Sequence, residues 1–288
     1  MTIEHTINHI HKTLAGYFNE KEILALRNII FEEILNINKI EYLTSKEKLL
    51  SPKQVEKVNQ TLEELKENKP IQYITGKTKF YGLNFNLSPS VLIPRPETEE
   101  LVDFILKNED LQNKNVLDIG TGSGCIAISI AKNTNCNMFA LDISEEALTI
   151  AKQNAEYNKS NVIFLQKDIL KTLEIEHNNK KIYFDIIVSN PPYVRDSEKS
   201  TMQKNVLDYE PHKALFVNDD NALVFYEKIA EFSQNNLNEK GTIYVEINEN
   251  LWYETIETFK KYNFENFNLR RDLFGKRRIL QIKKEKNV

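Results

Sequence analysis

The sequence predicts an α/β fold with a mostly parallel, seven-stranded sheet, preceded by a helical region. Three observations predict it: apolar residues repeat at helical spacing up to about residue 70, short apolar strands alternate with helical stretches from about residue 100, and a glycine-rich turn follows the first strand. Buried apolar strands that alternate with helices are typical of a doubly wound sheet. We therefore expect a helical domain over 1–70, a β-hairpin linker over 71–95 and an α/β domain over 96–288.

The helical domain is predicted from three apolar stripes. Each stripe repeats at intervals of three and four residues, which is the spacing of one helix face. Asn19 with Glu22, and Ser51 with Gln54, have the spacing of capping boxes and predict where two of the helices begin. The stripes cover 3–18, 23–34 and 55–65.

Between the helical and α/β regions the apolar period changes. Aromatic and aliphatic residues of 80–87 lie among glycines and asparagines, which predicts a short hairpin. The stretch 94–99, Pro-Arg-Pro-Glu-Thr-Glu, is a rigid joint that leads into a helix.

The α/β region contains short apolar strands separated by helical stretches. Two further strands near the end are joined by Gly275. The expected strands are 116–119, 139–142, 162–165, 185–188, 242–247, 266–272 and 278–283.

The composition excludes several classes of protein. The 38 basic and 42 acidic residues are mixed and give a net charge of −4, which is atypical of disordered tails and of proteins with a broad basic face for nucleic acid. Two cysteines provide no disulfide framework, so we expect a reducing compartment. The N-terminus does not resemble a signal peptide, and no apolar run approaches the roughly 20 residues of a membrane span. We expect a cytoplasmic protein without stable contacts to nucleic acid or membrane.

A glycine loop follows the first predicted strand and precedes a helix. From Asp118 to Gly124 it reads D-x-G-x-G-x-G, and Asp142 ends the next strand. We expect the backbone amides of Thr121–Gly124 to face a ligand at the helix N-terminus, and Asp142 to accept hydrogen bonds from ribose hydroxyls. Asp118 would repel a pyrophosphate but suits a ligand with an ammonium and no phosphate, such as S-adenosylmethionine. A nicotinamide cofactor, or a turn without a ligand, stays as an alternative.

A second motif, Asn190-Pro191-Pro192-Tyr193, follows the fourth predicted strand. Ligands of open α/β sheets bind at this edge. The prolines stiffen the loop and remove two backbone donors, which leaves carbonyl acceptors. Asn190 adds an acceptor and Tyr193 adds an aromatic face; a Pro-Pro turn that merely ends the strand is the alternative.

This second motif suits a planar NH2 group. An amide nitrogen is a poor nucleophile because its lone pair is delocalised. The side-chain oxygen of Asn190 and the carbonyl of Pro191 can hold its two hydrogens and stabilise the charge that grows on nitrogen. Stacking on Tyr193 would position the plane in line with a sulfonium methyl group.

The motifs together resemble the class I S-adenosylmethionine-dependent methyltransferases with a Rossmann-like sheet. The resemblance is closer to the bacterial N5-glutamine methyltransferases of peptide chain release factors, the PrmC/HemK type, and it spans nearly the whole chain. The block 94–99 is its most specific part. The stretches that carry it are 70–76, 80–83, 91–99, 116–124, 189–194, 210–215 and 272–278.

The resemblance implies that the helical domain docks a release factor and that the target is the glutamine of its Gly-Gly-Gln motif. It implies methyl transfer from S-adenosylmethionine, with S-adenosylhomocysteine as product, and a role in translation termination. Arg95, Glu97 and Thr98 are implied near the cofactor mouth. The expected cofactor-binding residues are Asp118, Gly120, Thr121, Gly122, Ser123, Gly124, Asp142, Asp168, Ile169, Asn190 and Thr98. The expected catalytic residues are Asn190, Pro191 and Tyr193, and the expected substrate-binding residues are Asn190, Pro191, Pro192 and Tyr193.

The sequence departs from the family pattern at two places. Many members have an aromatic residue where Ile169 stands, and a glycine-rich turn where residues 217–221 read Val-Asn-Asp-Asp-Asn. The first departure affects packing against the adenine, and the second affects the shape of a loop.

Other candidate residues carry weaker signals. His5 and His9 have helical spacing for a metal pair, but no cysteine or carboxylate cluster completes a site, so no metal is expected. Cys125 is expected to pack rather than act as a nucleophile. Glu246 ends the fifth strand and is expected to be a structural acid, with substrate contact as the alternative.

Three other functions stay open. A glutamine of a ribosomal protein is the nearest alternative substrate. An amino-methyltransferase of DNA or RNA would use the same loop, although it would need phosphate-binding charge. A binding module without catalysis is the third, although the intact Asp118, Asp142 and Asn190 argue against it.

Overall fold

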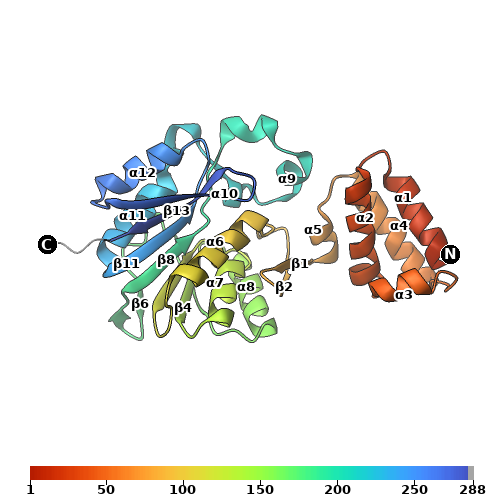
Figure 1. Ribbon diagram of the computed structural model, residues 1–288, viewed down its shortest axis with the longest axis horizontal. Coiled ribbons are helices and arrows are strands. Elements are labelled where there is room, and N and C mark those ends of the chain that lie inside the picture. Colours follow the sequence, from red (N-terminus) through yellow and green to blue (C-terminus); the bar gives the residue numbers. More distant parts are fainter. Residues whose placement is uncertain (285–288) are drawn as a thin grey trace. The chain divides into compact units, whose positions relative to one another are not determined.

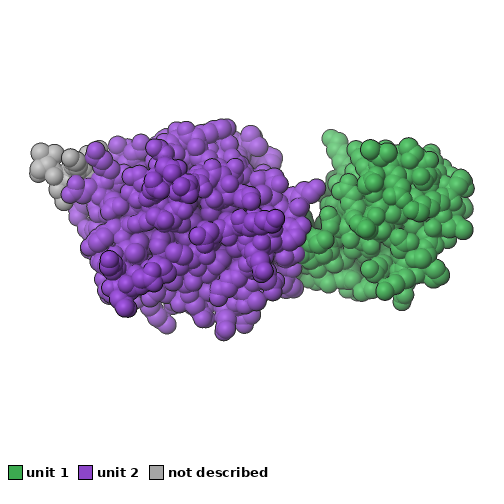
Figure 2. All heavy atoms as spheres, turned by 90° about the horizontal axis from the view of Figure 1, so that it is seen from below, with its two compact units in different colours: residues 1–77, 203–209 green, residues 78–202, 210–288 purple. Residues whose placement is uncertain are grey.

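The computed structural model describes residues 1–284, and the chain folds into two compact units (Figure 2). Unit 1 comprises residues 1–77 with 203–209, and unit 2 comprises residues 78–202 and those from 210 onward. The domain boundaries expected at residues 70 and 95 stay a prediction. The last four residues of the expected α/β domain lie outside the described residues.

Unit 1 is helical, as its apolar stripes predict. Its core is aliphatic, with the Phe31 and Tyr42 rings 4.7 Å apart. Both expected capping boxes are present, at Asn19 and at Ser51. The helices are α1 (Ile3–Leu14), α2 (Glu20–Ile29) with a π-helical continuation η1 (Ile30–Ile34), α3 (Lys39–Thr44), α4 (Pro52–Lys66), α5 (Ile71–Thr75) and α9 (Lys204–Tyr209).

Two features of unit 1 differ from expectation. The first stripe extends to Phe18, but α1 ends at Leu14, where a turn containing Gly16 begins. Helices α3 and α5 are absent from the expected elements, because each is shorter than the windows that reveal helical periodicity. Helix α5 occupies the start of the stretch expected to be a hairpin linker.

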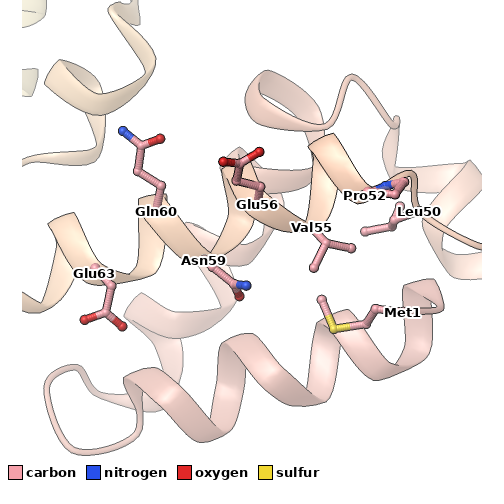
Figure 3. A pocket seen from close by; sticks show the side chains of 8 residues that line it. All are labelled: Met1, Leu50, Pro52, Val55, Glu56, Asn59, Gln60 and Glu63. Atoms are coloured by element: carbon pink, nitrogen blue, oxygen red, sulfur yellow. The ribbon is translucent and has the colours of Figure 1, made fainter.

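An open groove lies beside α4 in unit 1 (Figure 3). Its volume is about 620 Å³, and Met1 points toward Val55 across it. The other lining residues are Leu50, Pro52, Glu56, Asn59, Gln60 and Glu63. None of the predicted site residues lies in this groove.

Unit 2 is built on a seven-stranded sheet, and all the expected strands are present. The neighbouring order is β12-β13-β11-β8-β3-β4-β5, and in this sheet β13 runs opposite to the direction of the other six strands. The strands are β3 (Asn115–Ile119), β4 (Asn137–Asp142), β5 (Ile163–Gln166), β8 (Phe184–Ser189), β11 (Leu237–Glu246), β12 (Asn266–Arg271) and β13 (Arg277–Lys283).

Helices cover both faces of this sheet (Figure 1). On β3, Val116 belongs to the apolar core beneath one helical layer, whereas Leu117 belongs to the core beneath the other. One layer contains α6 (Pro96–Asn108), α7 (Cys125–Asn133) and α8 (Glu145–Tyr157), and the other contains α11 (Val224–Asn236) and α12 (Trp252–Lys261). The architecture is the predicted doubly wound α/β fold.

Short elements complete the structure. Strands β1 (Lys77–Phe80) and β2 (Leu83–Asn86) form the expected hairpin, with the Phe80 and Phe85 rings in edge contact 6.1 Å apart. In the described part of the chain, no helix is both long and apolar enough to span a membrane. The remaining elements are β6 (Glu176–His177), β7 (Lys180–Lys181), β9 (Val194–Arg195), η2 (Asp196–Thr201), α10 (His212–Leu215), β10 (Phe216–Val217) and η3 (Asp219–Asn221).

Candidate active site

The two predicted motifs meet at one edge of the sheet. Strands β3 and β8 are parallel neighbours, and Ile119 lies opposite Ser189. The glycine loop leaves β3 at Gly120, and the second motif leaves β8 at Asn190. Register therefore places both loops side by side at the carboxyl ends of adjacent strands, which is where ligands of open α/β sheets bind.

The glycine loop has a backbone that other residues adopt poorly. Gly120, Gly122 and Gly124 have φ of 74°, 54° and 83°. A Cβ atom on Gly124 would meet Cδ1 of Ile128 at 2.8 Å, so this glycine is also needed for packing. A Cβ on Gly120 or Gly122 would meet no protein atom within 4 Å, so these glycines leave open space over the loop.

The expectation that the loop amides face a ligand is wrong for most of them. The N–H of Thr121 donates to the Leu141 carbonyl at 3.0 Å, and that of Gly122 donates to Oδ2 of Asp142 at 2.8 Å. The N–H of Gly124 donates to the Thr121 carbonyl at 2.8 Å. The loop amides thus satisfy acceptors at the end of β4 and within the loop, because an unpaired buried N–H is unfavourable.

Asp118 lies beneath the loop, with no exposed surface. Its Oδ2 accepts from the Thr121 hydroxyl at 2.6 Å, while Oδ1 makes no hydrogen bond of normal geometry within the described chain. Burial raises the pKa of Asp118 to about 7, against the hydrogen bond from Thr121, which favours the charged form. The carboxyl shapes the loop through Thr121, and its contact with a ligand's ammonium stays a prediction.

Asp142 lies at the end of β4 and is partly exposed. Its two oxygens accept from the N–H groups of Gly122 and Ser144, at 2.8 and 3.0 Å. Burial raises its pKa, and these two amides oppose the rise. Each carboxylate oxygen retains a second lone pair, so the residue can still accept from neighbouring hydroxyls of a ribose.

The expected adenine contacts lie beyond β5. Asp168 is half-buried and accepts from the N–H of Leu170 at 2.9 Å, and Ile169 is buried in the apolar core. Their contacts with a cofactor stay predictions.

Asn154 on α8 is a site residue that sequence reasoning missed. It is completely buried, and its Nδ2 donates to the carbonyls of Ser123 and Asn86 at 2.9 and 3.0 Å. It therefore joins the glycine loop to the β1–β2 hairpin. No local motif marks it, because its partners lie far away in the sequence.

The Asn190 side chain is held by hydrogen bonds that lead to residues on α6 and β11. Its Nδ2 donates to the Thr98 hydroxyl at 3.1 Å, and Thr98 donates to Oε2 of Glu246 at 2.7 Å. Thr98 is 3% exposed and Glu246 is 1% exposed, whereas Asn190 is half-buried. Thr98 was expected near the cofactor mouth, and the structure places it directly behind Asn190. Glu246, expected to be a structural acid, belongs to this network.

Tyr193 bonds the other carboxylate oxygen of Glu246. Its hydroxyl donates to Oε1 of Glu246 at 2.8 Å, and Nη1 of Arg278 donates to the tyrosine oxygen at 3.4 Å. Arg278 also pairs with the buried Asp272 at 3.4 Å and lies over the Tyr193 ring. Burial raises the pKa of Glu246, against the hydrogen bonds from Thr98 and Tyr193. Burial also holds the pKa of Tyr193 well above its usual value, so its hydroxyl stays a donor.

The two prolines occupy different environments. Pro191 is buried, and Pro192 is half-buried. Nδ2 of Asn248 donates to the Tyr193 carbonyl at 3.2 Å and to Glu198 at 2.9 Å, which braces the end of the loop. The contacts of this loop with a substrate amide stay predictions.

An ion pair joins two further stretches of the sequence resemblance. Nη2 of Arg95 contacts Oε1 of the buried Glu210 at 2.5 Å, and the N–H of Ile93 donates to Oε2 at 3.2 Å. Glu210 therefore fixes the segment that leads into α6, the helix that carries Thr98.

The weaker candidates do not form a second site. His9 contacts the Asn59 side chain, and His11 contacts Glu20. Within residues 1–284, no group of three or more histidine, cysteine, aspartate or glutamate side chains is placed to hold a metal ion. Burial raises the pKa of Cys125 to about 12, so this thiol stays protonated near neutral pH.

The sequence matches two protein families. The methyltransferase domain family matches residues 110–285, and the PrmC N-terminal domain family matches residues 7–76. The release factor glutamine methyltransferase of Flavobacterium psychrophilum is 47% identical over 276 residues, which cover 94% of this chain and 95% of the relative. That of Bacteroides thetaiotaomicron is 41% identical, covering 94% of this chain and 96% of the relative.

Solved structures show the same fold at low sequence identity. A methyltransferase from Pyrococcus furiosus has a TM-score of 0.52 and 22% identity, covering 79% of this chain and 99% of that one. The 16S rRNA N2 G1207 methyltransferase of T. thermophilus, in complex with AdoMet and guanosine, has a TM-score of 0.52 and 18% identity, covering 73% of this chain and 50% of that one. These two structures show the fold alone. The family matches and the relatives above show that this chain is a methyltransferase and belongs to the release factor glutamine methyltransferase family.

Proposed function

We propose that this protein transfers a methyl group from S-adenosylmethionine to the side-chain amide nitrogen of the glutamine in the Gly-Gly-Gln motif of peptide chain release factors. One observation supports it above the others: the register of Ile119 with Ser189 brings the glycine loop and the Asn190 loop together. We further propose that unit 1 docks the release factor, and that the reaction modulates translation termination in the cytoplasm.

The residues of the first loop fit S-adenosylmethionine. Gly120 and Gly122 leave open space, and Asp142 offers carboxylate lone pairs for ribose hydroxyls. Oδ1 of Asp118 is buried below the loop and has no hydrogen-bond partner among residues 1–284, and the ionised carboxyl favours a cationic ligand over a pyrophosphate. When bound, S-adenosylmethionine supplies an electrophilic methyl group on a positively charged sulfur.

The second loop acts on the amide. With its Nδ2 engaged by Thr98, Asn190 presents its Oδ1 oxygen to one hydrogen of the substrate NH2 group, and the Pro191 carbonyl accepts the other. These acceptors become stronger partners as nitrogen gains positive charge, so they stabilise the transition state more than the ground state. The new N–C bond forms as the S–C bond breaks, and nitrogen then loses a proton to solvent. No strong base is required before attack.

Label transfer tests this function. Purified release factor and a copy whose Gly-Gly-Gln glutamine is alanine are incubated with the protein and methyl-labelled S-adenosylmethionine. We expect label on the intact factor and none on the alanine copy. Label that appears only in a parallel ribosomal-protein mixture, or only on plasmid DNA, would assign a different substrate.

A further inference from the structure

A row of hydrogen bonds runs behind Asn190 through Arg278, Tyr193, Glu246 and Thr98. The chemistry of these groups fixes which partner donates and which accepts in each bond. At one end stands Arg278, whose guanidinium donates and never accepts. It donates to the Tyr193 oxygen, so the single tyrosine hydrogen is free for Oε1 of Glu246. A carboxylate can only accept, so Glu246 also takes the single hydroxyl hydrogen of Thr98.

The direction of this row decides which way the Asn190 amide points. Since the Thr98 hydrogen is committed to Glu246, the Thr98 oxygen can only accept from its other neighbour. That neighbour is the Asn190 side chain, 3.1 Å away, and only its NH2 group can donate. The carbonyl oxygen Oδ1 must then be the end of the amide left for a ligand.

We propose that Thr98 and Glu246 are positioning residues that lock the Asn190 amide with its oxygen toward the substrate nitrogen. The inference rests on the proposed function, because an oxygen is needed there only if the acceptor of the methyl group carries N–H donors. With the amide reversed, Asn190 would present NH2 to a substrate NH2 group. Two donors would face each other, and the stabilisation described above would be lost.

The Glu246→Gln substitution tests the direction with little change of shape. Arg278 still drives the Tyr193 hydrogen toward the side-chain oxygen of the introduced glutamine, which leaves the glutamine NH2 facing Thr98. Thr98 then accepts from the glutamine and donates to Asn190, which turns the asparagine oxygen inward. We expect kcat to fall roughly 100-fold, the size of effect that misorientation of a catalytic group produces. The KM for release factor should change far less.

Thr98 provides a second test that keeps buried volume nearly constant. Thr98→Val removes the hydroxyl and should lower kcat by a comparable factor, whereas Thr98→Ser keeps the hydroxyl and should restore kcat close to wild type. The matched control is Thr258→Val. Thr258 on α12 is also buried, but within residues 1–284 its hydroxyl bonds only the Glu254 carbonyl of its own helix, at 2.9 Å. For Glu246→Gln the control is Glu109→Gln, which alters another tyrosine–glutamate pair, with Tyr244 at 2.6 Å.

The outcomes separate this inference from the proposed function. If wild-type protein labels no release factor, the proposed function fails. If wild type is active and Glu246→Gln and Thr98→Val keep wild-type kcat, the positioning inference fails while the function stands. Circular dichroism and S-adenosylhomocysteine binding by calorimetry report folding. A loss of kcat in both variants with retained binding, together with recovery in Thr98→Ser, supports the inference. Equal losses in Thr98→Val, Thr98→Ser and Thr258→Val would overturn it.

Discussion

The two halves of the active site are built by different means. The glycine loop turns through the positive φ angles of its own glycines, and its amides donate to the Leu141 carbonyl and the Asp142 carboxylate at the end of the neighbouring strand. The Asn190 loop is instead held by side chains from remote segments, with Thr98 on α6 and Glu246 on β11. A local sequence motif marks the position of the first half, whereas side chains that are remote in the sequence set the orientation of the second.

The position of a binding loop and the orientation of a side chain within it are therefore determined by different parts of the molecule. A glycine-rich turn between a strand and a helix leaves open space over its own backbone, and its contacts with Leu141, Asp142 and Asn154 hold it in place. An asparagine at a strand end has an amide that can present either oxygen or nitrogen, and something else must choose between them. The network behind Asn190 makes that choice, so substitutions in the two halves should affect binding and turnover separately.

The largest expected effect is that of Asn190→Ala. Removal of the amide oxygen should lower kcat by roughly 10²–10³-fold, as loss of one transition-state hydrogen bond does elsewhere. Cofactor affinity should fall much less, and single-turnover label transfer with calorimetry would measure both. Asn268→Ala is the control, because that asparagine bonds Gln281 on the outer strands. If Asn190→Ala lowered cofactor affinity as much as kcat, the two halves of the site would not have separate roles in binding and turnover.

Asp142→Ala should have the opposite signature. Loss of hydrogen bonds from ribose hydroxyls to a carboxylate is expected to weaken cofactor binding by roughly 100-fold. At saturating S-adenosylmethionine, kcat should recover most of its wild-type value. Asp110→Ala removes another carboxylate that accepts a backbone N–H, from Gln112 at 3.1 Å, and serves as the control. Unchanged affinity in Asp142→Ala would mean that the ribose does not bind there.

The pH dependence of kcat should report on Glu246. Burial raises the pKa of this carboxyl, and a protonated carboxyl can donate to Thr98 and release the Asn190 amide. Activity should therefore fall as pH falls, with a midpoint above the usual range of a glutamate. The groups that face Glu246 are Thr98 and Glu97 on α6, Tyr193, Tyr226 on α11 and Arg278 on β13.

The neighbour Glu97 provides the control for this pH effect. Its negative charge raises the pKa of Glu246, so Glu97→Gln should move the acid midpoint of kcat to lower pH. A midpoint that does not respond to Glu97→Gln would assign the titration to another group.

Asp118 should make the free energy of unfolding depend on pH. Its pKa in the folded protein, about 7, lies above its ordinary value of 3.8, so between these values the folded state binds more protons than the unfolded chain. The free energy of unfolding should fall as pH rises through this window, by at most about 1.4 kcal/mol per pH unit from this group, and level off above it. In Asp118→Asn this contribution should vanish in urea titrations, whereas Asp110→Asn should keep it. Identical slopes in wild type and Asp118→Asn would contradict the assignment.

The same contrast explains which parts of the fold and of the site could be predicted from the sequence. Apolar runs predicted the strands of the sheet, and the D-x-G-x-G-x-G pattern placed the turn at Gly120–Gly124, because both are local signals. The direction of the loop amides was predicted wrongly, since it depends on the carbonyl of Leu141 on the next strand. The contact of Thr98 with Asn190 joins residues that are 92 positions apart, and no sequence pattern in either segment predicts it.

The central claim is that the Asn190 loop directs a methyl group to an amide nitrogen. Acid hydrolysis of release factor labelled by this protein tests it directly, because a methyl group on the glutamine side-chain nitrogen leaves as volatile methylamine. We predict that the label is recovered as methylamine from the intact factor, and that Asn190→Ala yields almost none. Label retained in a non-volatile amino acid would contradict the account.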